Sequence, residues 1–192
     1  MATWVAEWIA RPSRWLRLMG VTLVVGAVWI WASAAPAAAT TGGQIPSPRE
    51  GFLAPDFSLD LLGGGEITLS ELRGSAVIIN LWASWCPPCR AEMPAIQRVF
   101  ERSQGRGLVV LAVNTTFQDS EQAAQTFVQE FGLTFPIALD RDGVVSRSYQ
   151  LRALPSTFFV DREGIIRKVI IGGPMNEATI QTTVEEILEG SG

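Results

Sequence analysis

Long apolar runs alternate with amphipathic segments over most of the chain after residue 50. Two seven-residue runs, Ala76–Trp82 and Leu108–Asn114, lack the period-two alternation of a half-exposed strand. We therefore expect strands that are covered on both faces. Helical spacing follows each run, at Arg90–Arg102 and from Ser120 to about Phe131, and Ser120 is suited to begin its helix.

Weaker patterns predict the other elements of the domain. They indicate a hairpin of Ala54–Asp60 and Glu66–Leu69, a helical turn at Ser70–Gly74, a strand at Pro136–Leu139, a short helix at Val144–Tyr149, a hairpin of Ser156–Val160 and Ile165–Ile171, and a helix at Glu177–Leu188. This order predicts one α/β domain over residues 51–192, with a mixed central sheet, helices on both faces and an N-terminal hairpin.

The first fifty residues have a different pattern. Residues 1–17 carry three arginines and one glutamate, and no charged residue occurs between Arg17 and Arg49. Residues 18–39 are apolar and then rich in alanine, close to the ~20 residues that a transmembrane helix needs. Residues 40–50 contain two glycines and two prolines, which predicts a linker.

Two interpretations of residues 18–39 remain open. The length favours a single-pass membrane anchor, with the basic residues 1–17 in the cytoplasm. The alternative is a cleaved signal peptide with Ala-x-Ala sites at Ala32/Ala34 and Ala37/Ala39. The first predicts a cell-membrane protein whose domain is extracytoplasmic, and the second predicts a secreted or periplasmic domain.

The candidate chemistry lies in Trp85-Cys86-Pro87-Pro88-Cys89, between the first buried strand and the helix that follows it. A helix N-terminus stabilises an anion, and only a thiolate attacks a disulfide. Pro87 suits the first helical position, where a missing N–H costs nothing. We therefore predict Cys86 as the nucleophile and Cys89, three residues later, as the cysteine that resolves the mixed disulfide.

Composition argues against several other functions. The chain has two cysteines and no histidine, so a zinc site would lack ligands, and Arg90 stands where a c-type haem motif needs histidine. A purely structural disulfide across so short a loop would constrain little of the unfolded chain. The net charge is −4, and because residues 1–17 contribute +2, the rest of the chain carries −6, which argues against nucleic acid as a partner. We predict no metal and no cofactor.

Several segments together resemble a known family. Trp82–Pro94, Val113-Asn114, Phe135–Asp140 and Leu154–Phe158 look like a thioredoxin-fold protein of the TlpA/ResA-like class, over roughly residues 51–190. The resemblance implies a thiol–disulfide oxidoreductase with an extracytoplasmic domain. Its implied substrates are protein disulfides, among them the CxxCH cysteines of apocytochrome c. Its implied electron donor is a membrane thiol carrier, and the class is usually monomeric.

The resemblance also assigns roles to single residues. Pro155 matches a proline that is cis in thioredoxin folds and would present the Leu154 backbone to an extended substrate. Glu92 matches an acidic residue that relays protons to the thiols, although a first-turn glutamate also simply favours the helix dipole. Trp85 matches a tryptophan that shields the sulfurs, with plain packing as its alternative, and Pro87 and Pro88 complete the predicted substrate contact.

One departure from cytoplasmic thioredoxin strengthens the interpretation of Glu92. Asn80 occupies the strand position where thioredoxin has a buried aspartate, and asparagine cannot titrate. A proton relay therefore cannot run through residue 80, which makes Glu92 the better candidate.

The predicted function is a protein-disulfide reductase serving cytochrome c maturation. The alternatives are a general disulfide oxidant or isomerase, a thiol peroxidase, and a copper-delivery module, the last two disfavoured by the cysteine motif and by the lack of histidine.

Overall fold

The computed structural model describes residues 19–26, 29 and 45–190. The chain divides into two units, Met1–Thr40 and Thr41–Gly192. The described residues of the first unit are helical, and among all described residues no helix is both long and apolar enough to cross a bilayer. The predicted basic segment 1–17 and most of the predicted anchor or signal segment 18–39 lie outside the described residues, so both stay predictions.

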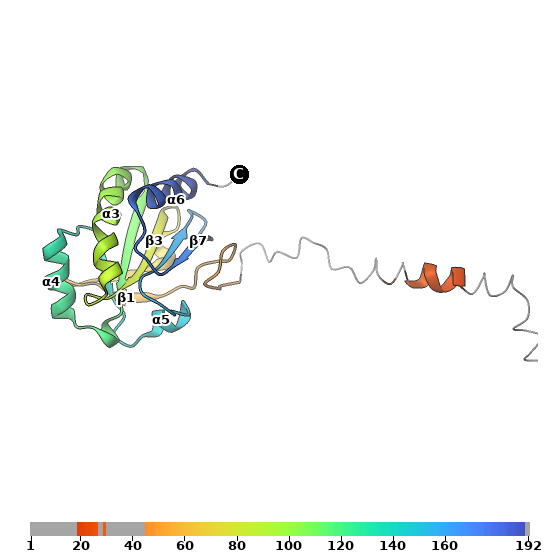
Figure 1. Cartoon of the computed structure of the whole chain (residues 1–192), viewed down its shortest axis with the longest axis horizontal. Coiled ribbons are helices and arrows are strands. Elements are labelled where there is room, and N and C mark those ends of the chain that lie inside the picture. Colours follow the sequence, from red (N-terminus) through yellow and green to blue (C-terminus); the bar gives the residue numbers. More distant parts are fainter. Residues whose placement is uncertain (1–18, 27–28, 30–44, 191–192) are drawn as a thin grey trace, which may run out of the picture. The chain divides into compact units, whose positions relative to one another are not determined.

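The second unit is built on a five-stranded mixed sheet (Figure 1). Its order is β5-β4-β3-β6-β7, in which β3, β4 and β5 are parallel, β6 is antiparallel to β3, and β7 is antiparallel to β6. The strands are β3 (Ala76–Trp82), β4 (Leu108–Asn114), β5 (Ile137–Leu139), β6 (Ser156–Val160) and β7 (Ile166–Ile171). The two predicted buried strands thus have the bounds expected from the sequence.

Helices follow the strands in the predicted order. They are α3 (Pro87–Ser103), α4 (Glu121–Phe131), α5 (Val144–Ser148) and α6 (Glu177–Glu189), with short 3₁₀ segments η1 (Leu69–Leu72), η2 (Gln104–Arg106) and η3 (Thr116–Gln118). Ser120 caps α4 as predicted, because its Oγ accepts a hydrogen bond from the Ala123 N–H. The predicted N-terminal hairpin is present but shorter, as β1 (Ser58–Asp60) and β2 (Glu66–Thr68).

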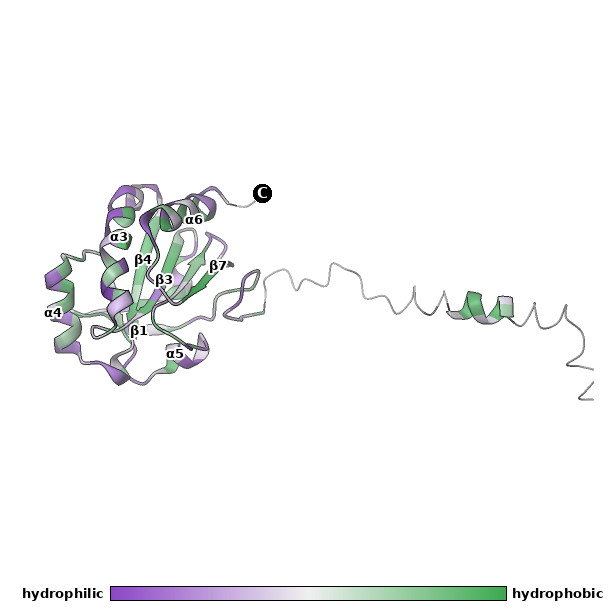
Figure 2. Ribbon diagram, in the orientation of Figure 1, coloured by the Kyte–Doolittle hydropathy of each residue, from purple (hydrophilic) through white to green (hydrophobic). Residues whose placement is uncertain are grey.

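Strand β3 shows why an unbroken apolar run predicts a doubly covered strand. All seven of its residues are buried. Ile78 and Trp82 pack in a core with α3, α4 and α6, whereas Val77 and Ile79 pack on the other face with α5 and the N-terminal hairpin. Figure 2 shows the corresponding apolar strands between helices whose outer faces are more polar. Asn80 is the polar exception within β3, and its side chain hydrogen-bonds to Glu92 on α3.

Candidate active site

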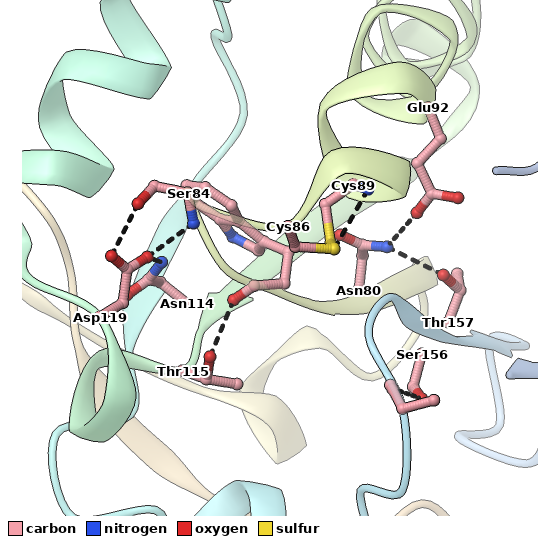
Figure 3. The surroundings of a disulfide bond; sticks show 12 residues. Asn80, Ser84, Cys86, Cys89, Glu92, Asn114, Thr115, Asp119, Ser156 and Thr157 are labelled. Carbon is pink, nitrogen blue, oxygen red and sulfur yellow. Dashed lines mark hydrogen bonds between the residues drawn. A yellow bond between two sulfur atoms is a disulfide. The ribbon is translucent and has the colours of Figure 1, made fainter. Parts of the chain in front are cut away.

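The cysteine pair lies where β3 leads into α3, as predicted. Cys86 is the N-cap of α3, with extended backbone angles, and Pro87 and Pro88 open the helix. The helix therefore begins at Pro87, the residue predicted for the first helical position, three residues before the helical spacing that starts at Arg90. Proline is tolerated there because it needs no N–H partner in the first turn. The two sulfurs are joined in a disulfide, with the Cα atoms 5.3 Å apart (Figure 3).

The backbone of the first turn points a donor at the sulfur of the first cysteine. The Cys89 N–H lies 3.3 Å from Cys86 Sγ and donates to it. Such a donor, together with the dipole of a 17-residue helix, favours a thiolate at Cys86 when the pair is reduced. Cys89 is fully buried and Cys86 is only 2% exposed, and Cys86 rather than Cys89 lines the groove beside the pair.

The peptide that enters the helix is held by a carboxylate from a distant loop. Asp119 accepts hydrogen bonds from the Ser84 N–H (2.6 Å), the Ser84 hydroxyl (2.7 Å) and the Asn114 side chain (2.9 Å). It also accepts from the N–H of Ser120 (2.9 Å). Partial burial raises the pKa of Asp119, but the hydrogen bonds from Ser84, Asn114 and Ser120 outweigh it and hold the pKa below its usual value. Sequence reasoning missed Asp119.

Glu92 lies one turn beyond Cys89 and is fully buried. Its Oε1 accepts from Asn80 Nδ2 at 2.9 Å (Figure 3). Its Oε2 accepts from the Met175 N–H at 3.1 Å. Burial raises the pKa of Glu92, and these two hydrogen bonds only partly oppose the rise. The structure thus places Glu92 on the buried side of α3, and its predicted role as a proton relay stays a prediction.

The loops before β6 and after β7 also contribute to the site. The Leu154–Pro155 peptide bond is cis, as the sequence predicts, and Gly173–Pro174 is a second cis bond that sequence reasoning missed. A Cβ on Gly173 would lie 2.8 Å from Glu92 Oε2 and 2.9 Å from Pro155 Cγ. Only glycine fits at position 173 without displacing one of these side chains. The Gly-Gly-Pro sequence at 172–174 is the one feature of the sequence that could have indicated an unusual turn here.

A groove of about 550 Å³ opens beside the cysteines. Five of the predicted site residues line it, namely Trp85, Cys86, Pro87, Pro88 and Leu154. The indole of Trp85 is 56% exposed, and its N–H donates to the Gln118 carbonyl at 3.0 Å. Trp85 thus lines the groove together with Cys86 and leaves much of its surface exposed. Within residues 19–26, 29 and 45–190, no group of three or more His, Cys, Asp or Glu side chains is arranged to hold a metal ion.

A buried cysteine pair lies at the start of a helix that follows a central strand, and Cys86 shares a groove with Leu154, the residue before a cis-proline. This arrangement is that of a thiol–disulfide oxidoreductase of the thioredoxin fold. The chain belongs to the AhpC/TSA family, whose model matches residues 51–169. Within this family it is ResA-like, which confirms the predicted class.

Curated relatives support this assignment. The chain is 39% identical over 137 residues to thiol-disulfide oxidoreductase ResA of Geobacillus thermodenitrificans, covering 71% of this chain and 77% of that protein. It is 36% identical over 144 residues to ResA of Bacillus subtilis, covering 75% and 79%. The chain is thus a protein-disulfide oxidoreductase.

Solved structures agree on the fold. A putative thiol:disulfide interchange protein DsbE from Chlorobium tepidum matches with a TM-score of 0.65 and 30% identity, covering 71% of this chain and 95% of that one. StoA from Bacillus subtilis matches with a TM-score of 0.60 and 28% identity, covering 67% and 96%. The thioredoxin-like α/β fold is thereby confirmed.

Proposed function

We propose that this chain is an extracytoplasmic protein-disulfide reductase that serves cytochrome c maturation. The observation that carries the proposal is the cysteine pair at the first turn of α3, in a chain whose relatives are ResA proteins. The proposed substrates are protein disulfides, with the CxxCH pair of apocytochrome c first among them. No metal or cofactor enters the proposed reaction.

The proposed reaction is a two-step exchange. In the reduced protein, the Cys86 thiolate attacks one sulfur of the substrate disulfide, which breaks that bond and forms a mixed disulfide. The departing substrate thiolate takes up a proton. The Cys89 thiolate then attacks Cys86 Sγ, releases the second substrate thiolate and closes the Cys86–Cys89 disulfide. Two electrons pass to the substrate, and a membrane dithiol carrier is proposed to return them.

Glu92 is proposed to hold the proton that this exchange needs. A carboxyl whose pKa is raised by burial carries a proton closer to neutral pH than an exposed glutamate does. It stands one helical turn from Cys89. Proton loss from Cys89 and proton gain by the leaving thiolate are the two steps it would assist.

The remaining predicted residues are proposed to bind the substrate chain. The backbone of Leu154, ahead of cis-Pro155, would pair with an extended peptide beside the sulfurs. Trp85, Pro87 and Pro88 would form the apolar contact on the other side of the groove. We further propose that residues 18–39 anchor a monomeric protein in the membrane, with cleavage of a signal peptide as the alternative.

The direction of electron flow separates this proposal from a disulfide-forming oxidant. The full chain should be equilibrated with reduced and oxidised dithiothreitol, and the fraction of Cys86–Cys89 disulfide measured by thiol alkylation. We expect a reduction potential near −270 mV, as for a thioredoxin-like reductant. A value near −120 mV would mark an oxidant and would overturn the proposal.

The substrate class is tested in cells. A strain that lacks this protein should lose covalent haem in its c-type cytochromes, and the wild-type gene should restore it. The Cys86→Ser and Cys89→Ser variants should fail to restore it, whereas the Glu101→Gln control on the exposed face of α3 should succeed. Full haem attachment without the protein would remove cytochrome c maturation from the proposal and leave the oxidoreductase assignment in place.

A further inference from the structure

The groove beside the cysteines has a one-sided charge pattern. Among the described residues that line it, Arg147 and Arg152 carry charge, and none is an aspartate or glutamate. The chain as a whole carries 19 acidic and 15 basic residues. A cationic groove in an acidic protein is therefore a local feature, which the overall composition does not explain.

Neither guanidinium is neutralised by a neighbour that the structure describes. Other arginines form ion pairs with carboxylates, namely Arg90, Arg98, Arg102, Arg106, Arg141 and Arg167. Within the described part of the chain, Arg147 and Arg152 form none, and Arg147 donates only to the Asp142 backbone carbonyl at 2.8 Å. Both side chains are exposed, so their charges are available to a ligand in the groove.

The local fold holds these two arginines in the groove that Cys86 also lines. Helix α5 carries Arg147 and is anchored by Asp140, which accepts from the N–H groups of Val145 and Ser146. The helix is followed by Gln150, whose φ of +50° is a left-handed conformation that non-glycine residues seldom adopt. Because of this turn, the chain from residue 151 leads through Arg152 to the cis bond at Leu154–Pro155, and Leu154 lines the groove with Cys86.

The groove also provides apolar surface in addition to the two charges. Trp85, Phe117, Leu151 and Leu154 line it, and Trp85 and Phe117 are 56% and 49% exposed. Exposed aromatic side chains beside unpaired arginines are a combination enriched in binding surfaces. The chemistry that complements both features is an extended peptide with an apolar residue and a carboxylate.

We propose that this groove selects substrate segments in which acidic residues flank the reactive cysteine, with Arg147 and Arg152 as the specificity-determining side chains. This inference rests on the proposed function, because it names a class of substrate for the same site. The carboxylates meet Arg147 and Arg152, and an adjacent apolar side chain covers Trp85. Charge complementarity acts mainly on the rate of encounter, so discrimination appears in kcat/KM and weakens with salt.

The test uses disulfide-bridged Cys-x-x-Cys peptides that differ only in flanking residues: two glutamates, two glutamines or two lysines. The reduced full chain is mixed with each peptide, and kcat/KM for disulfide exchange is measured at low and high salt. We expect the glutamate peptide to exceed the glutamine peptide by about threefold to tenfold at low salt, the range for two partly exposed charge pairs. The lysine peptide should be slowest, and about 0.5 M salt should bring the three rates together.

The variants are judged by the ratio of rates for the glutamate and glutamine peptides, which cancels any general damage to the cysteine pair. Arg147→Gln and Arg152→Gln should each lower the ratio, and the double variant should bring it close to one. The double variant Arg147→Glu/Arg152→Glu, which makes the groove acidic, should reverse the order, so that the lysine peptide becomes the fastest. Arg49→Gln, which removes the same charge outside the groove, should leave the ratio unchanged.

A wild-type ratio near one, or a ratio that survives the double variant, overturns the inference while leaving the reductase intact. The failure of the proposed function looks different. If the oxidised chain instead oxidises the reduced peptides, and shows the same Arg-dependent preference for glutamate, the groove inference stands and the reductase direction is lost.

Discussion

The amide of Asn80 donates to the carboxyl of Glu92 across 2.9 Å, joining two side chains that are both fully buried behind the cysteine pair. The same Nδ2 also donates to Thr157 Oγ1 at 2.9 Å, and Asn80 Oδ1 has no partner among the described residues. Asn80 therefore turns its donors toward Glu92 and β6. It solvates the carboxyl without supplying a charge, so burial still dominates the pKa of Glu92.

This arrangement predicts a specific dependence of stability on pH. A carboxyl whose folded-state pKa is raised favours folding in its protonated form. Its contribution is complete below the unfolded pKa of about 4.3 and is lost as pH rises through the folded pKa. We therefore expect Glu92→Gln, which cannot ionise, to become progressively more stable relative to the wild type as pH increases from about 4 to 8.

Urea unfolding of the full chain at about pH 4, 6 and 8 measures this difference. Glu101→Gln is the matched control, because Glu101 lies on the same helix but is exposed. The control should track the wild type across the range. A free-energy difference between Glu92→Gln and the wild type that is flat with pH would mean that Glu92 ionises as an exposed glutamate does.

Glu92 should also affect the exchange reaction itself. If it relays protons, Glu92→Gln should slow the resolution of the mixed disulfide by up to about a hundredfold, and it should shift the titration of the Cys86 thiol. Stopped-flow measurement of both, from about pH 5 to 9, distinguishes a proton role from simple packing. An unchanged rate together with an unchanged thiol titration would reduce Glu92 to a structural residue.

The sequence could predict the central strands because their signals are local. Ala76–Trp82 and Leu108–Asn114 are uninterrupted apolar runs, and the structure has both with those bounds. The cysteine pair was predictable for the same reason, since a CxxC between a strand and a helix places both sulfurs at one helix terminus. The strands of the N-terminal hairpin were predicted too long, since the pairing covers only three residues on each side.

The partners of the site were much less accessible from the sequence. Ser84 and Asp119 are 35 residues apart, and Glu92 and Met175 are 83 apart. The first contact exists because β4 lies beside β3 in the sheet, and the second because the segment between β7 and α6 packs in the same core as α3. Nothing in the local pattern of Asp119 or Met175 indicates a partner. The sequence likewise did not indicate that Arg147 and Arg152 line the same groove as Cys86, because this depends on how α5 and the following loop are placed in the fold.

The close approach of Gly173 to Glu92 and Pro155 yields a packing prediction. In Gly173→Ala the new methyl would lie under 3 Å from both side chains, so one of them must move. We expect a loss of about 1–3 kcal/mol of stability, as for an overpacked core, and slower peptide reduction. Gly105→Ala is the control, because a Cβ there meets nothing within 4 Å and Gly105 has no positive φ. If Gly173→Ala proves as stable as the control, the loop has room for a methyl group and the close packing around Gly173 is refuted.

The carboxylate of Asp119 should influence the potential of the cysteine pair. Asp119→Ala leaves the Ser84 N–H without its acceptor, which predicts a loss of about 1–3 kcal/mol of stability. Two effects then act on the disulfide in the same direction. A loosened entry to α3 lowers the effective concentration of one cysteine near the other, and removal of a negative charge favours the thiolate of the reduced form.

Both effects raise the reduction potential, by up to about 30 mV if the dithiol–disulfide equilibrium changes tenfold. Redox equilibration of Asp119→Ala and Asp119→Asn against the wild type measures the shift, and Asp142→Asn controls for loss of an exposed charge nearby. Because the pKa of Asp119 is held low, its contribution to stability should persist until the pH falls below about 3.9 and then disappear. A destabilised Asp119→Ala with an unshifted potential would show that Asp119 supports the loop alone, with no effect on the sulfurs.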